Sequence, residues 1–325
     1  MVEAGTQTMI ALVGYLIIVL GIGYWSARKV EDEEDYFIGG YKLPGFALAL
    51  SERSTDMSGW LLIGMPGLAY ASGLSAIWIL LGTAGGAVFQ WIFYSRKFME
   101  EKRKSGAVTP NDYIAKRFPG GAKTIRTIGA IIVFIFYIAY VGSQFEAGGK
   151  VLDQTFGIDP QIGIIIVAAI VIVYALAGGF MTVVWTDTLQ ALLMVFTLVV
   201  LPALLLIDVV ADPTLSIMGA LEASGGGRAS WLAGKSGAAA GLLLGANLSW
   251  FWGYMGGEPH IFVRMMALKD ESQRRAGIIT AITWGTLTSA GAFLLGLLAR
   301  TIHKTPPELV ADREMVLPYM VLQHT

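Results

Sequence analysis

The sequence has no cysteine and only three histidines among its 325 residues. The absence of cysteine excludes disulfide bonds, thiolate catalysis and cysteine-ligated metals. The histidines, at positions 260, 303 and 324, have no spacing that suggests a metal site. Charged residues are also scarce, at 14%, and the net charge of -1 argues against a nucleic-acid partner. No Walker loop, dinucleotide-binding fingerprint or catalytic triad is present, so nothing in the sequence indicates an enzyme.

Long apolar runs are what the chain does contain. Hydrophobic residues make up 55% of it and the mean hydropathy is +0.62, which is typical of a polytopic membrane protein. A helix needs about 20 apolar residues to cross about 30 Å of hydrocarbon. By that criterion the sequence predicts eight spans: Met9–Trp25, Gly45–Tyr70, Ser75–Tyr94, Ile125–Val151, Gln161–Gly178, Met181–Val209, Gly237–Met266 and Gly277–Ala299. The first run is longer than a signal-peptide core and no basic residue precedes it, so we do not expect a secretory signal.

Lysine and arginine are distributed unevenly between the two predicted sides of the membrane. With the N-terminus outside, sixteen of them fall in inward loops and six in outward loops, and it is cytoplasmic loops that carry the positive excess. We therefore expect a multi-pass protein of the plasma (inner) membrane, embedded in the lipid bilayer, with its N-terminus outside.

Two hydrophilic segments interrupt the spans without forming separate domains, so residues 1–325 are predicted to be a single transmembrane domain. Residues 100–124 are expected to be a cytoplasmic amphipathic loop, with a short helix that Asn111 or Asp112 caps after Pro110. Residues 211–236 are expected to be a flexible extracellular loop. The stretch from Thr301 onward resembles the approach to a ninth span, so the chain is expected to be truncated after about eight transmembrane helices.

Two of the predicted spans are broken by polar or glycine-rich residues. Gly45–Tyr70 is interrupted by "SERSTDMSG" and again at Pro66, and Gly237–Met266 is interrupted by "GANLSWFWGYMGGEPH". Broken spans at matching places in two halves indicate an inverted-repeat transporter. Unwound backbone at that depth is tolerated only where it lines a cavity or is buried in protein. The alternative of a channel fits two broken helices less well than alternating access does.

The first break contains an acidic residue, Asp56, near the middle of a predicted span, where burial of a charge costs the most. An aspartate at the bilayer centre costs about 2.5–3.5 kcal/mol on insertion scales and is functional by default. Asp56, the hydroxyls of Ser54, Thr55 and Ser58, and freed carbonyls together form the oxygen-rich set that a Na⁺ ion prefers. The alternative is that Asp56 only pairs with Arg53 or caps the following half-helix. Glu52 and Arg53 are adjacent and are expected to point in different directions, with an internal ion pair that serves packing alone as the alternative.

The second break and the turn between the fifth and sixth spans add further candidates. The aromatic residues of the second break lie mid-span and are expected to form an apolar wall for a small substrate, with an interfacial aromatic belt as the alternative. His260 is interpreted as either a proton relay or a buried histidine bonded to backbone. Asp187 is interpreted as part of an inner gate, or as an acid at a helix N-terminus.

Three blocks of the sequence resemble the sodium/solute symporter family, and within it the sodium/proline branch. They are "DMSGWLLIGMPGLAYASGL", "ALAGGFMTVVWTDTLQALLM" and "GEPHIFVRMMALKD", and the resemblance runs over nearly the whole chain. It implies an all-α membrane protein with a LeuT-type inverted-repeat core, preceded by one extra N-terminal helix. It also implies Na⁺ symport of a small solute, L-proline above all, into the cell by alternating access.

The resemblance assigns roles to individual residues. The implied Na⁺ site comprises Ser54, Asp56, Met57 and Ser58, with Ser54 and Met57 contributing carbonyls and Asp56 the acid. The implied substrate residues are Thr55, Ser58, Gly59, Trp60, Tyr140, Phe251 and Pro259. Asp187 remains the candidate for the inner gate.

Two departures from the family pattern leave the substrate open. Tyr41 and then Lys42 follow Gly39–Gly40, where proline carriers have an arginine, and Glu52 and Arg53 replace small residues. The alternatives are symport of another amino acid or of a pantothenate-like carboxylate, or a role as the membrane module of a sensor protein.

Overall fold

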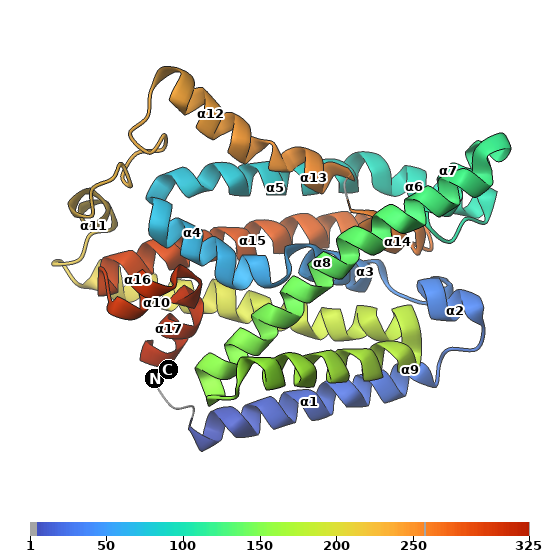
Figure 1. The fold of residues 1–325 in the computed structure, drawn as a ribbon, viewed down its shortest axis with the longest axis horizontal. Helices are drawn as coiled ribbons and strands as arrows, with labels where there is room; N and C mark the ends of the chain where they lie inside the picture. The colour runs from blue at the N-terminus through green and yellow to red at the C-terminus, as the bar shows by residue number, and fades with distance from the viewer. Residues whose placement is uncertain (1–4, 257, 325) are drawn as a thin grey trace. The chain divides into compact units, whose positions relative to one another are not determined.

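The computed structural model describes residues 5–256 and 258–324, and every regular element within these ranges is helical (Figure 1). The α-helices are α1 Thr6–Ala27, α2 Glu33–Ile38, α3 Gly45–Gly59, α4 Met65–Ser72, α5 Ile77–Phe89, α6 Ser95–Ser105, α7 Pro110–Arg117, α8 Ala122–Phe156, α9 Pro160–Val195, α10 Leu201–Ala211, α11 Ile217–Ala223, α12 Gly237–Leu248, α13 Trp250–Gly256, α14 Pro259–Met266, α15 Glu271–His303, α16 Pro307–Ala311 and α17 Val316–His324. Wider π-helical turns occupy Trp60–Gly64, Gln90–Tyr94 and Phe196–Val200. The expected all-α class is confirmed.

Among the described residues, five helical stretches are long and apolar enough to cross a membrane: Thr6–Ala27, Gly45–Ser105, Pro119–Asp153, Pro160–Ala211 and Glu271–His303. The second and fourth have 61 and 52 residues, more than twice the length that one crossing needs. The chain reverses inside both, at Gly73 with φ 64° and at Gly179 with φ 56°. Glycine suits these positions because it carries no Cβ that would clash at positive φ.

The chain divides into two compact units, each assembled from three separate segments. The first unit comprises residues 1–55, 92–189 and 259–278, and the second comprises residues 56–91, 190–258 and 279–325. The segments alternate along the chain, so neighbouring parts of one helix belong to different units in α3, α9 and α15.

Small residues let the helices of the first unit approach closely. A Cβ on Gly178 would lie 3.0 Å from the backbone of Ala27, and one on Gly179 would lie 2.4 Å from the carbonyl oxygen of Tyr36. Ser26 and Thr182 share a buried hydrogen bond of 2.6 Å at the same contact. The outward faces of α1 and α8 carry exposed isoleucine, valine and phenylalanine, as expected of helices that contact lipid.

The second unit has its core where α4, α10, α15, α16 and α17 meet. Tyr70, Leu205, Leu295 and Leu317 are among the buried side chains there. Close helix approach again depends on glycine, since a Cβ on Gly291 would lie 1.5 Å from the carbonyl oxygen of Leu198.

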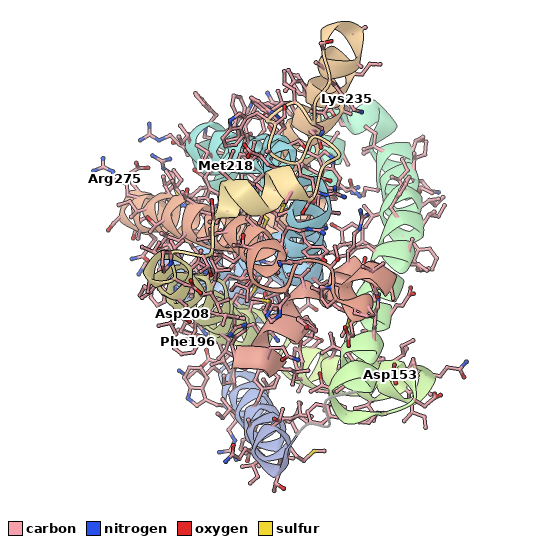
Figure 2. All side chains as sticks on the ribbon, turned by 90° about the vertical axis from the view of Figure 1, so that its left-hand side faces the viewer. Asp153, Phe196, Asp208, Met218, Lys235 and Arg275 are labelled. Atoms are coloured by element: carbon pink, nitrogen blue, oxygen red, sulfur yellow. The ribbon has the colours of Figure 1, made fainter. Side chains whose placement is uncertain are left out.

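Residues 211–236, the predicted extracellular loop, include a short helix as well as turns. They contain α11 and a series of turns, and Figure 2 marks Met218 and Lys235 toward the two ends of the segment. The Arg228 guanidinium donates to the carbonyl of Ala71 at 2.9 Å, and the Trp78 indole donates to the carbonyl of Trp231 at 2.7 Å. These bonds attach the segment to the helices of the second unit.

Two local predictions need correction. The helix after Pro110 exists, but its cap is Thr109, whose hydroxyl accepts from the Asp112 amide at 3.1 Å. Proline takes the first helical position because it has no amide hydrogen to lose there, so the cap is the residue directly before Pro110. Pro66 does not interrupt its span either, because it lies in the first turn of α4, directly after a π-helical turn.

Candidate functional site

The predicted break in the span Gly45–Tyr70 lies at Ser58. This residue has φ 42° and ψ -151° inside the range of α3, a conformation that side-chain-bearing residues rarely adopt. The helix resumes after it as the π-helical turn Trp60–Gly64. Such an interruption removes neighbouring carbonyls from the regular helical ladder and leaves them able to bind other partners.

Six of the predicted site residues belong to the second unit: Asp56, Met57, Ser58, Gly59, Trp60 and Phe251. Asp56 is buried, with 5% of its surface exposed, and Met57 is 1% exposed. The structure therefore places a carboxylate out of solvent, two residues before the helix break.

The predicted aromatic wall is a packed cluster within the second unit. The Trp60 ring stacks on Trp250, with centroids 5.9 Å apart and planes inclined by 21°. Phe251 packs edge-on against Phe89, at 5.7 Å. α13 approaches α5 closely, since a Cβ on Gly86 would lie 2.5 Å from the Phe251 carbonyl. Gly257, in the second break, lies outside the described residues.

The remaining predicted residues belong to the first unit, and three of them meet around Thr55. The Tyr140 hydroxyl donates to the Thr55 carbonyl at 3.0 Å. The Thr55 hydroxyl donates to the Asp187 carboxylate at 3.0 Å, and the Ser54 hydroxyl donates to the Asp187 carbonyl at 3.3 Å. α3 and α9 are thus joined by hydroxyl groups that converge on one acid.

Arg264 completes this cluster, and the sequence reading did not select it. Its guanidinium forms an ion pair with Asp187 at 3.1 Å and donates to the hydroxyls of Ser51 and Thr55, each at 2.9 Å. A further donor reaches the His260 carbonyl at 3.0 Å. We call Ser51, Thr55, Asp187 and Arg264 the Asp187 cluster. Arginine suits it because its planar fork supplies several donors in fixed directions.

A signal for Arg264 was present in the sequence. The residue lies inside the predicted span Gly237–Met266, where an ionisable group is functional by default, but it was counted among the charges of an inward loop. The structure shows it buried, with 5% exposure. Asp187 lies two turns beyond the reversal at Gly179, so it is not in the first turn of a helix.

The expectation that Glu52 and Arg53 point in different directions is wrong. The two side chains are fully buried in the first unit and form an ion pair with each other through two hydrogen bonds. Adjacent helical residues leave the backbone in different directions, but long side chains can curl back. Burial favours that outcome because an unpaired charge in the interior is costly.

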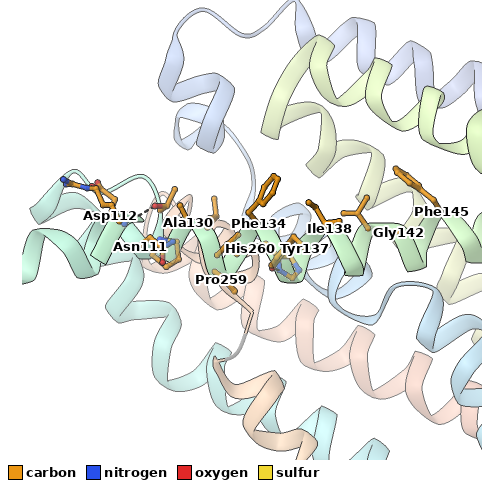
Figure 3. A pocket seen from close by; sticks show the side chains of 16 residues that line it. Asn111, Asp112, Ala130, Phe134, Tyr137, Ile138, Gly142, Phe145, Pro259 and His260 are labelled. Carbon is orange, nitrogen blue, oxygen red and sulfur yellow. Dashed lines mark hydrogen bonds and ion pairs between the residues drawn. The ribbon is translucent and has the colours of Figure 1, made fainter. Parts of the chain in front are cut away.

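A groove of about 1000 Å³ runs along α8 in the first unit and contains Pro259, another predicted substrate residue. Figure 3 shows its wall, with Phe134, Tyr137 and Ile138 on α8 and His260 on α14. The Tyr137 hydroxyl and the His260 ring form a hydrogen bond. His260 therefore has a side-chain partner, which neither of the two interpretations of its role included.

Lys42, which follows the unusual Tyr41, has defined partners in the first unit. Its ammonium lies 2.7 Å from the carboxylate of Asp35 and 3.3 Å from that of Glu31. The hydrogen bond from Lys42 lowers the pKa of the buried Asp35 carboxyl below its usual value. Lys42 thus supplies the positive charge of a local ion cluster in the turn that precedes α3.

The sequence matches a known protein family over most of its length. The pattern of the Sodium:solute symporter family matches residues 36–323. The osmoregulated proline transporter OpuE of Bacillus subtilis is 32% identical over 312 residues, which are 95% of this chain and 62% of that protein. The sodium/proline symporters of Salmonella typhimurium and Escherichia coli are each 31% identical, over 94% of this chain and 59% of theirs.

A solved structure shares the fold. It is described as the substrate-bound outward-open state of a Na⁺-coupled sialic acid symporter, and it superposes with a TM-score of 0.83 at 20% sequence identity. The match covers 99% of this chain and 67% of that chain. This chain spans about three fifths of the length of the curated relatives that it matches.

Proposed function

Because the chain belongs to the sodium:solute symporter family, we propose that it forms the greater part of a Na⁺-coupled symporter that carries L-proline into the cell. The helices form a LeuT-type inverted-repeat core behind one extra N-terminal helix, and the N-terminus lies outside the plasma membrane. Transport belongs to the whole protein, since the relatives are longer than this chain.

The observation that carries the proposal is the buried Asp56 carboxylate beside the helix break at Ser58. An ionisable residue within a membrane span marks an ion or substrate pathway by default. We propose that Asp56 faces the transported Na⁺ ion. Asp56 supplies the negative charge, while Ser54, Met57 and Ser58, which lie within the range of α3, supply oxygen atoms.

The solute is assigned to proline for two reasons. The relatives named above are proline transporters, and the three ring methylenes of proline form a compact apolar surface that aromatic side chains accommodate well. On the second unit, Gly59, Trp60 and Phe251 provide an apolar surface. On the first unit, Thr55, Tyr140 and Pro259 provide hydroxyl, carbonyl and apolar groups.

We assign the Asp187 cluster to gating on the inner side. Its ion pair and hydroxyl bonds join α3, α9 and α14, so separation of these helices requires several buried polar bonds to break together. A contact of this kind holds one conformation closed until binding energy elsewhere shifts the equilibrium.

Uptake of radiolabelled L-proline into proteoliposomes tests the function. The complete protein is expected to accumulate proline when Na⁺ is present outside, and to lose that accumulation when choline replaces Na⁺ at equal osmolarity. Proline uptake that is equal in Na⁺ and choline would rule out symport. Na⁺-dependent uptake of a different amino acid or of pantothenate, with proline failing to compete, would keep the mechanism and reject the solute.

A further inference from the structure

Two of the three histidines of the chain lie side by side in the second unit. His303 ends α15 and His324 is the last residue of α17, yet their Nε2 atoms are 3.1 Å apart. Twenty residues separate them along the chain, which is why their spacing gave no indication of a metal site. The polypeptide between them folds back through α16, so that two helix ends present imidazoles to each other.

The pair is held in orientation and remains accessible. The Tyr319 ring packs edge-on against His303, at 5.1 Å and 90°, and restricts the rotation of that imidazole. The two imidazoles are inclined by 67°. His324 is exposed and His303 is partly exposed, so an ion in solution can reach both nitrogens.

The distance between the nitrogens matches two ligands of one metal ion. Imidazole nitrogens bind Zn²⁺ at about 2.0–2.1 Å, so two ligands at a tetrahedral ion lie about 3.3 Å apart. The observed distance of 3.1 Å between the two Nε2 atoms would have to increase only slightly. Without an ion, one neutral imidazole donates its hydrogen to the other. Zn²⁺ would use the Nε2 lone pairs of both rings, so each neutral imidazole would carry its hydrogen on Nδ1 instead.

We propose that His303 and His324 form a Zn²⁺ site that ties α17 to the end of α15. The described part of the chain has no group of three or more His, Cys, Asp or Glu that could hold a metal, so water completes the coordination. Imidazole selects Zn²⁺, Ni²⁺ and Cu²⁺ and not Mg²⁺ or Ca²⁺, which prefer oxygen. The site is independent of the proposed Na⁺ symport.

The surrounding charge is compatible with a cation. The segment between the histidines carries Glu308, Asp312 and Glu314 against Lys304 and Arg313. Arg300, one turn before His303, directs its guanidinium to the carbonyl of Tyr70 at 2.9 Å. Its positive charge is therefore committed to a backbone partner.

Isothermal titration of the purified complete protein with ZnCl₂ tests the site, after removal of any polyhistidine tag and of bound metal. One Zn²⁺ ion per chain is expected, with no heat of binding for MgCl₂. His303→Ala and His324→Ala should each weaken Zn²⁺ binding by at least about tenfold, which corresponds to 1.4 kcal/mol. Gln323→Ala, the matched exposed neighbour, should bind as the wild type does.

Folding of each variant is checked by gel filtration and helical circular dichroism. If an alanine variant fails these checks, His303→Gln with His324→Gln replaces it, since glutamine retains the hydrogen bond but is a poor Zn²⁺ ligand. Absence of Zn²⁺ binding to the wild type would overturn the proposal. So would unchanged binding in the folded double variant, or a loss that follows His260→Ala instead.

Discussion

Asp56 illustrates what one residue contributes to this chain. Its carboxylate is buried, and the helix that carries it is broken two residues later. Both facts were anticipated, because a polar run within an apolar span is visible in the sequence. The neighbouring Glu52–Arg53 ion pair was expected only as an alternative, since a spacing rule describes where side chains start and not where their ends meet.

Substitution of Asp56 should separate an ion-binding role from a structural one. Asp56→Asn keeps the size and one oxygen but removes the charge, which at about 4 Å and an effective dielectric of about 20 contributes roughly 4 kcal/mol. Water entry and relaxation reduce the net loss to about 1–3 kcal/mol, or roughly five- to hundred-fold in the Na⁺ half-saturation of uptake. Asp56→Glu keeps the charge and should retain part of the function.

The matched control is Asp208→Asn, the same change at an exposed aspartate of the second unit (Figure 2). Its Na⁺ half-saturation should equal that of the wild type after normalisation to the amount in the membrane. A normal Na⁺ half-saturation in Asp56→Asn, with only its abundance reduced, would show that Asp56 is a structural cap.

Asp35 gives a pH-dependent prediction at the same scale. Its pKa is lowered in the folded protein by the hydrogen bond from Lys42, so its contribution to stability is complete above the unfolded value near 3.9. The contribution is lost as the pH falls through the lower, folded pKa. Asp35→Asn should therefore unfold at a lower temperature than the wild type at pH 6, and the difference should shrink below about pH 4.

Thermal unfolding in detergent at pH 6, 4 and 3 provides the measurement. Glu33→Gln removes an exposed acid from the same helix and should show almost no difference from the wild type at any of these pH values. A difference between Asp35→Asn and the wild type that stays constant from pH 6 to 3 would contradict the linkage.

At the scale of elements, glycine reversals and helix breaks organise the fold. The turn "AGGF" was read from the sequence, and the structure places its reversal at Gly179, where φ is 56°. The close contact of that glycine with Tyr36 was not foreseeable, because Tyr36 lies more than 140 residues away and only tertiary packing brings it near.

Gly179→Ala tests how strictly this reversal requires glycine. The new Cβ would have to tolerate positive φ and would lie 2.4 Å from the Tyr36 carbonyl oxygen, so we expect a loss of at least about 2 kcal/mol in unfolding free energy. Gly14→Ala in α1 is the matched control, because nothing lies within 4 Å of its Cβ position. That change should be neutral or stabilise the helix by about 0.5–1 kcal/mol.

Unfolding by heat or by a denaturing detergent compares the two alanine variants. Equal stability of Gly179→Ala and Gly14→Ala would mean that the reversal adapts to a side chain and that the contact with Tyr36 is not tight.

At the scale of the whole molecule, hydropathy and local breaks predict the class and most element positions. Hydropathy and local breaks each depend on residues that are consecutive in the sequence. The Asp187 cluster and the histidine pair depend on residues far apart in sequence, so periodicity contains no record of them. Arg264 combines the two cases, because its position within a span could be predicted from the sequence but its hydrogen-bond and ion-pair partners could not.

Because segments of the two units alternate along the chain, the parts of each unit are synthesised at different times. The first unit needs residues 259–278 to join residues 1–55, and about 200 residues must be made between them. At 5–20 residues per second this delay is roughly 10–40 s. Asp187 is made about 77 residues before Arg264, so its ion-pair partner follows roughly 4–15 s later. Until then the ion pair between Asp187 and Arg264 cannot form, and the link between α9 and α14 is missing.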